Sequence, residues 1–90
     1  MQLVAAPGVI ESVGRRGGSL YVWPRKDRCC GGAIRLEAAT DPPGKAFRRV
    51  DADGFDLYVA AGMALPDSLH LEVGRRGRIR AFWNGLAWVA

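Results

Sequence analysis

Two runs in the second half of the chain alternate between apolar and polar side chains, which is the pattern of a β-strand with one buried face. The first run covers residues 55–60 and the second covers 68–73. Their apolar members are Phe55, Leu57 and Val59 in the first run, and Leu69, Leu71 and Val73 in the second. A helix would need apolar residues every three or four positions, so both runs predict strands that face a common core.

Further segments are predicted as strands because they are rich in β-forming residues and end at turn signals. They cover residues 3–4, 19–25, 33–39, 46–51 and 78–83. Asp53 and Gly54 predict a hairpin turn between the segments on either side of them. Pro24 indicates a sheet edge or a strand end, since proline cannot donate a ladder hydrogen bond.

Residues 7–16 are predicted to form a helix. Pro7 lies near its start, an acidic residue follows in the first turn, and two arginines lie in the last turn, where each charge suits the helix dipole. Gly17 and Gly18 form a strong stop signal. Three apolar residues of this segment are β-branched, so a strand remains the alternative.

Together these elements predict one α+β domain over residues 1–90, a small and mostly antiparallel β-sandwich or rolled sheet of about six strands with one N-terminal helix. The composition is that of a folded domain, with 49% hydrophobic and 24% charged residues. A core this small would gain buried surface by pairing, which favours a homodimer.

The only two cysteines, Cys29 and Cys30, are adjacent and lie in a basic segment ahead of two glycines. Nearby positive charge raises the thiolate fraction, which is the nucleophilic and metal-binding form. A disulfide between neighbours would be strained and readily reduced, so it would suit redox chemistry. The predicted site therefore has Cys29 and Cys30 as the redox or metal-binding residues, surrounded by Arg25, Arg28, Gly31 and Gly32. The alternative is a pair of small apolar residues in a turn, without chemistry.

Two thiolates fill only half of a tetrahedral metal site. The only histidine, His70, lies on a distant predicted strand, and its place in the alternation puts it on the solvated face. Completion would require His70, a carboxylate such as Asp27, or the same cysteine pair from a second chain. Four thiolates across a dimer would suit zinc or a [2Fe–2S] iron–sulfur cluster.

The formal net charge is +4, and eleven of the thirteen basic residues are arginine, which suits phosphate binding. A candidate nucleic-acid surface comprises Arg48, Arg49, Arg75, Arg76, Arg78 and Arg80, with Phe82 or Trp83 for stacking. These arginines are spread over turns and strands and are interrupted by aspartates. The interpretation as a solvated surface is therefore favoured, and a nucleic-acid partner is not expected.

One pentapeptide, Val-Gly-Arg-Arg-Gly, occurs twice, at residues 13–17 and 73–77. Duplication of a half-domain would explain the repeat, but the flanking sequences do not match. Chance in a chain rich in arginine and glycine is the favoured explanation.

No apolar run reaches the length of a membrane span, and the first residues lack the features of a signal peptide. The expected location is the cytoplasm, where thiols are reduced.

The order of elements resembles the A-type iron–sulfur carrier (HesB/IscA-like) domain over nearly the whole chain. The turn at residues 29–32 corresponds to the family's first cysteine turn. The family's C-terminal Cys-Gly-Cys is absent, because residues 84–87 read Asn-Gly-Leu-Ala. The closer likeness is to small HesB-like proteins with a vicinal Cys-Cys (CC/Se motif), some of which use selenocysteine there.

This resemblance implies thiol redox or iron–sulfur and metal-related chemistry, with a protein partner in thiol redox or iron–sulfur metabolism. The alternative is a non-catalytic binding or scaffold module, for a protein or a nucleic acid, on a degenerate carrier fold.

Overall fold

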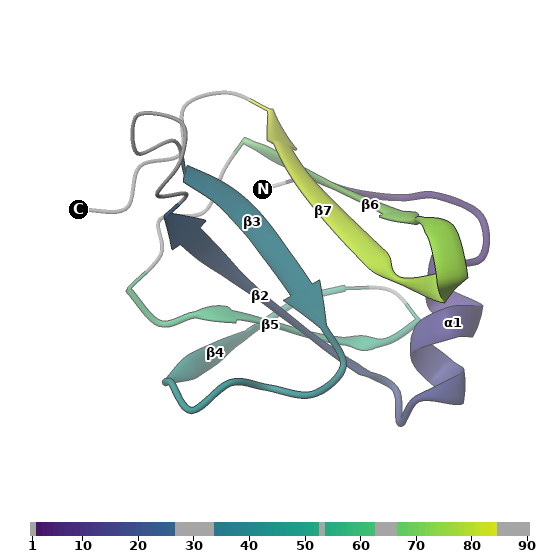
Figure 1. Cartoon of the computed structure of the whole chain (residues 1–90), viewed down its shortest axis with the longest axis horizontal. Helices are drawn as coiled ribbons and strands as arrows, with labels where there is room; N and C mark the ends of the chain where they lie inside the picture. The colour runs from purple at the N-terminus through teal and green to yellow at the C-terminus, as the bar shows by residue number, and fades with distance from the viewer. Residues whose placement is uncertain (1, 27–33, 53, 63–66, 85–90) are drawn as a thin grey trace.

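The chain folds into two small β-sheets and one short helix, as a computed structural model shows for residues 2–26, 34–52, 54–62 and 67–84 (Figure 1). The first sheet has the order β1-β6-β7 and the second has the order β3-β2-β5-β4. The strands of the first sheet are β1 (Gln2–Ala5), β6 (Ser68–Val73) and β7 (Ile79–Asn84). The strands of the second sheet are β3 (Ile34–Ala39), β2 (Ser19–Lys26), β5 (Asp56–Ala60) and β4 (Phe47–Val50).

Both sheets are mixed. β1 pairs with β6 and β2 pairs with β5 in parallel, whereas the other three pairings are antiparallel. The predicted α+β class is confirmed for the part of the chain that the structure describes, but seven strands replace about six, and the prediction of a mostly antiparallel sheet is too simple. Turn signals show where a strand ends but not which earlier strand it joins, so they could not reveal the parallel pairs.

Pro24 lies inside β2 and not at its end. It is opposite Leu36 of β3, while the pairing of β2 with β5 extends only from Ser19 to Val22. The proline therefore lies beyond the ladder with β5, on a part of β2 that is paired on one side. This position explains how a central strand accommodates a residue that cannot donate a backbone hydrogen bond.

The core lies between the two sheets and the helix, and both alternating runs contribute to it as predicted. Its fully buried large side chains are Val9, Val13, Leu20, Val22, Leu57, Val59, Leu69 and Leu71. Phe55 is also buried, but Val73 is 37% exposed, so the prediction that it faces the core is wrong. Val73 is the last residue of β6, where the strand leaves the core and enters the following turn.

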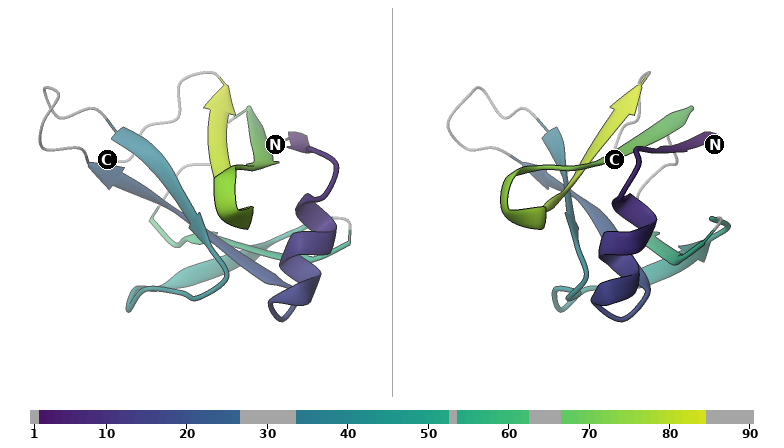
Figure 2. Two further views of the ribbon diagram at one scale, coloured as in Figure 1. Left: turned by 45° about the vertical axis from the view of Figure 1, so that its right-hand side comes forward. Right: turned by 90° about the vertical axis from the view of Figure 1, so that its right-hand side faces the viewer.

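The predicted helix is confirmed as α1 (Val9–Arg15). It packs against β2 and β6 and covers one end of the domain (Figure 2). Gly17 and Gly18 have positive φ angles, and the Gly18 N–H donates to the Val13 carbonyl at 2.9 Å. This bond joins the sixth residue of the segment 13–18 to the first, which closes the helix C-terminus as a Schellman motif. The motif explains why two glycines follow the helix.

The two copies of the repeated pentapeptide adopt different structures. Residues 13–17 form the end of α1 and its cap, whereas residues 73–77 form the end of β6 and the short 3₁₀ turn η1 (Arg75–Gly77). A duplicated half-domain would give both copies the same structure. The difference favours chance as the origin of the repeat.

Among the described residues, no helix has the length and apolar character required to cross a membrane.

Candidate anion-binding site

The predicted thiol site falls mainly outside the described residues, because Arg28, Cys29, Cys30, Gly31 and Gly32 all lie between positions 27 and 33. The strands on either side of this segment are described: Lys26 and Ile34 are partners in the antiparallel pairing of β2 with β3. Arg25 is the one predicted site residue within the described part of the chain. Its guanidinium forms an exposed ion pair with Glu37, at 3.4 Å.

The described residues contain no group of three or more histidine, cysteine or acidic side chains that could hold a metal ion. His70 lies on β6, is partly exposed, and its Nε2 is 3.3 Å from the hydroxyl of Ser68. The prediction that it alternates with buried leucines is confirmed. Asp27, the other predicted additional ligand, lies outside the described residues, as do both cysteines.

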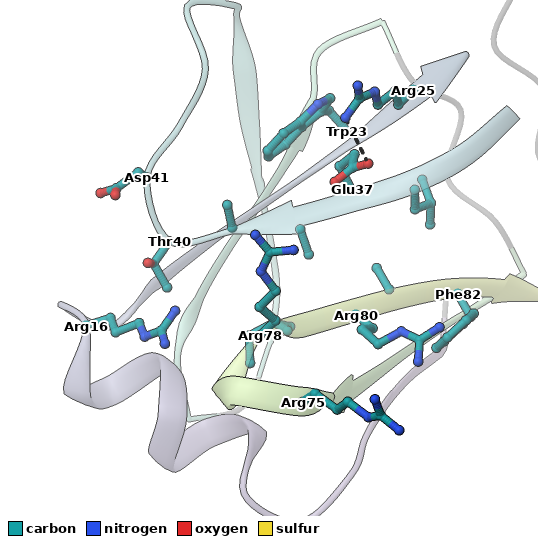
Figure 3. A pocket seen from close by; sticks show the side chains of 15 residues that line it. Arg16, Trp23, Arg25, Glu37, Thr40, Asp41, Arg75, Arg78, Arg80 and Phe82 are labelled. Atoms are coloured by element: carbon teal, nitrogen blue, oxygen red, sulfur yellow. Dashed lines mark hydrogen bonds and ion pairs between the residues drawn. The ribbon is translucent and has the colours of Figure 1, made fainter. Parts of the chain in front are cut away.

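An open pocket of about 970 Å³ lies where β3 and β7, the edge strands of the two sheets, run side by side (Figure 3). These two strands are not hydrogen-bonded to each other. The pocket is lined by Arg16, Trp23, Arg25, Leu36, Glu37, Ala38, Ala39, Thr40, Asp41, Arg75, Arg78, Ile79, Arg80, Ala81 and Phe82. Its volume is within the range of ligand sites, which is about 300–1,000 Å³.

The pocket lining is strongly basic. It contains five arginines and two carboxylates, so its formal charge is +3. The arginines come from four separate places: the end of α1, β2, the turn η1, and β7 with the residue before it. Arginines that are scattered along the sequence therefore line one pocket, although Figure 3 shows the side chains of Arg16, Arg78 and Arg80 pointing in different directions.

Two of these arginines have acidic neighbours. Arg25 is paired with Glu37, and the guanidinium of Arg80 is 3.8 Å from Glu72, at the limit of an ion pair. Arg80 also lies 5.2 Å over the ring of Phe82, a cation–π arrangement that holds its head group at the pocket wall.

The other three pocket arginines, Arg16, Arg75 and Arg78, have no acidic partner among the residues that the structure describes. All three are exposed. The neighbouring Arg15 differs, because its guanidinium forms an ion pair with Glu11 on the helix surface and does not line the pocket. The pocket thus contains three guanidinium groups that have no acidic partner in the described part of the chain.

Two glycines lie beside arginines of the pocket. A Cβ on Gly74 would stand 2.7 Å from Cδ of Arg80, so the absence of a side chain leaves space for the arginine stem. A Cβ on Gly77 would stand 3.4 Å from the guanidinium of Arg16, and Gly77 has a φ of +72°. The left-handed backbone favours glycine at this position, whereas a Cβ at that distance would make only an ordinary contact with Arg16.

Aromatic rings complete one wall of the pocket. Trp23 is half-buried, with its ring edge-to-face against Phe47 at 6.3 Å between centroids. Tyr21 contacts the same Phe47 at 5.1 Å and stacks on Tyr58 at 5.0 Å. The outer face of the four-stranded sheet therefore carries a continuous aromatic cluster, and Trp23 is the member that reaches the pocket.

The sequence identified part of this site. The candidate nucleic-acid surface that was predicted from the sequence shares Arg75, Arg78, Arg80 and Phe82 with the pocket. Arg49 lies on β4 and pairs with Asp56 at 3.0 Å, away from the pocket. Arg16, Arg25 and Trp23 were not part of that surface, and no spacing in the sequence could have joined them to β7.

Comparison of the chain with models of known protein families, with curated proteins and with solved structures finds no match.

Proposed function

We propose that this domain is a binding module for an anionic ligand, which it holds in the pocket between β3 and β7. The observation that carries the proposal is that Arg16, Arg75 and Arg78 line one open pocket without acidic partners among the described residues. Like charges gathered around one pocket repel each other, and an anion bound there reduces that cost.

The chemistry of the ligand follows from the guanidinium group. Arginine presents planar pairs of N–H donors that match the oxygens of phosphate or carboxylate, and it is charged at any physiological pH. Each charge-assisted hydrogen bond is worth about 1.5–3 kcal/mol. The exposure of the three arginines reduces this gain through solvent screening, so binding requires several of them together.

Titration calorimetry with inorganic tripolyphosphate tests this function. The purified wild-type chain is expected to bind the probe, and Arg78→Gln and Arg75→Gln are each expected to weaken binding about tenfold, the loss of roughly one charge-assisted contact. Arg15→Gln is the matched control, since this arginine is paired with Glu11 outside the pocket. Absence of binding by the wild type, or an equal loss in the control, would contradict the proposal.

A second candidate function is thiol redox or iron–sulfur and metal-related chemistry at Cys29 and Cys30. Its support is the adjacency of the only two cysteines, together with the antiparallel register of Lys26 with Ile34 on the strands that flank them. The order of a strand, a helix, a strand, the cysteine segment and further strands also fits the proposed relation to HesB-like carriers. A protein partner in iron–sulfur or thiol metabolism, a homodimer and a cytoplasmic location belong to this proposal.

Anaerobic reconstitution with iron and sulfide separates the versions of this second function. A coloured protein whose mass corresponds to a dimer would support a cluster shared by two chains. A colourless protein that cycles between dithiol and disulfide would support redox chemistry. Unreactive thiols and a colourless protein would contradict both, and a Cys29→Ser, Cys30→Ser variant should still bind tripolyphosphate, because the two functions are independent.

A further inference from the structure

We infer that the anionic ligand of the pocket is a single-stranded nucleic acid, with phosphates on the arginines and bases on the aromatic rings. The inference rests on the proposed function and specifies its ligand. It goes beyond anion binding because it assigns a role to Trp23 and Phe82, which contribute no charge to the pocket they line.

The basic groups follow a line and do not surround one point. Arg78 directly precedes β7 with an extended backbone, and Arg80 and Phe82 follow on the same face of that strand. Side chains two residues apart on a strand are about 6.6 Å apart. Successive phosphates of an extended nucleic-acid strand repeat over a similar length, so a linear polyanion matches this row of side chains better than a single compact anion does.

Arg16 extends the basic row at the end of the pocket near the helix, and Arg75 adds a further charge beside β7. In Figure 3 the side chain of Arg16 reaches from the end of α1 toward that of Arg78, and Arg75 projects from the turn before β7. With Arg78, these residues supply three pocket guanidiniums without acidic partners among the described residues. They provide the electrostatic part of the binding, which should depend strongly on salt.

Phe82 of β7 and Trp23 of β2 offer rings to the bases, and Figure 3 draws them on opposite sides of β3. Phe82 is 43% exposed although it is a large apolar residue, and the guanidinium of Arg80 lies over its ring at 5.2 Å. Trp23 is half-buried and is fixed by its edge contact with Phe47, so it presents a preorganised ring. Stacking of a base on such a ring does not depend on the base sequence, because every base has a π-face.

Other polyanions use less of this site. An acidic peptide would need the arginines but gives no role to the aromatic wall. Duplex DNA is read by helices or ribbons that protrude into its grooves, whereas this site is concave. A flexible single strand can follow the pocket and place bases against its rings.

Fluorescence anisotropy with a short labelled oligothymidylate tests the inference, with an abasic oligomer of the same length and tripolyphosphate as parallel probes. We expect Phe82→Ala and Trp23→Ala each to weaken oligothymidylate binding about five- to hundredfold, while binding of the abasic oligomer and tripolyphosphate changes little. Tyr58→Ala is the aromatic control, since this residue belongs to the outer cluster but does not line the pocket. If Trp23→Ala fails to fold, the exposed Phe82 still provides the test.

The salt dependence is a second measurement. Contact with three phosphates predicts a slope of about −2 for the logarithm of the association constant against that of the salt concentration. Equal binding of oligothymidylate and the abasic oligomer, or tighter binding of polyglutamate, would overturn the nucleic-acid ligand and leave anion binding intact. Failure of tripolyphosphate and all oligomers to bind would overturn the proposed function itself.

Discussion

The guanidinium of Arg16 lies 3.4 Å from the point where a Cβ on Gly77 would stand. Arg16 caps the end of α1, and Gly77 ends the turn between β6 and β7, so this approach joins two elements at the basic end of the pocket. Each residue belongs to one copy of the repeated pentapeptide. The two copies differ in structure but meet in space, which makes their equivalent positions useful pairs for mutagenesis.

The last glycine of each copy gives the first prediction. Gly17 and Gly77 both have positive φ angles, but only at Gly77 would a Cβ approach another group within 4 Å. Alanine at either position should cost about 1–2 kcal/mol of unfolding free energy in urea denaturation, because of the left-handed backbone. Both variants should bind tripolyphosphate with similar affinity, because a Cβ 3.4 Å from the guanidinium of Arg16 would make only an ordinary van der Waals contact. A loss of affinity in Gly77→Ala alone would contradict this expectation and show that the added methyl group moves Arg16.

The first glycine of each copy gives the next prediction. Gly14 lies in α1 with nothing within 4 Å of an added Cβ, so Gly14→Ala should raise the unfolding free energy by about 0.5–1 kcal/mol. At Gly74 the Cβ would stand 2.7 Å from Cδ of Arg80, so Gly74→Ala should lower it by about 1 kcal/mol through overpacking. Urea denaturation of both variants measures the difference. A gain in stability for Gly74→Ala would show that the stem of Arg80 moves away without cost.

The valines that begin the two copies test the core. Val13 is fully buried and Val73 is 37% exposed. Removing the two methyl groups of Val13 should cost about 1.5–3 kcal/mol, through lost burial and the cavity that remains. Val73→Ala should cost about 0.5 kcal/mol, since most of that cost is absent at a half-exposed site. Similar losses for both valines in urea denaturation would contradict the burial difference.

The local structure of this chain follows from its sequence because it depends on neighbouring residues. The alternation at 55–60 predicted β5, the run at 68–73 gave the bounds of β6, and Gly17 and Gly18 ended α1 as expected. The parallel pairing of β2 with β5 was not predictable, because it is decided by how the sheet faces pack and not by local preference.

The pocket was predictable only in part, and for the same reason. Arg80 and Phe82 lie on β7 and Arg78 directly precedes it with an extended backbone, so their common face could be deduced from a period of two. Arg16 and Trp23 reach the same pocket through the packing of α1 and β2 against the rest of the domain. Identical pentapeptides that form a helix end and a strand end show that five residues do not determine their own structure.

The ion pair between Arg25 and Glu37 gives the last prediction. Breaking this pair should increase the affinity of the pocket for an anion. Glu37 neutralises Arg25 across β2 and β3 at 3.4 Å, and both side chains line the pocket. Glu37→Gln removes the negative charge but keeps a side chain of similar shape, so that Arg25 becomes available to the ligand. The pair is exposed and therefore contributes at most about 1 kcal/mol, so the affinity for tripolyphosphate should rise about two- to fivefold while stability changes by less than about 1 kcal/mol. Asp56→Asn is the control, since Asp56 pairs with Arg49 outside the pocket and its removal should not affect affinity. If both variants raise the affinity equally, the gain reflects the overall charge of the domain, and the ligand does not depend on the pocket between β3 and β7.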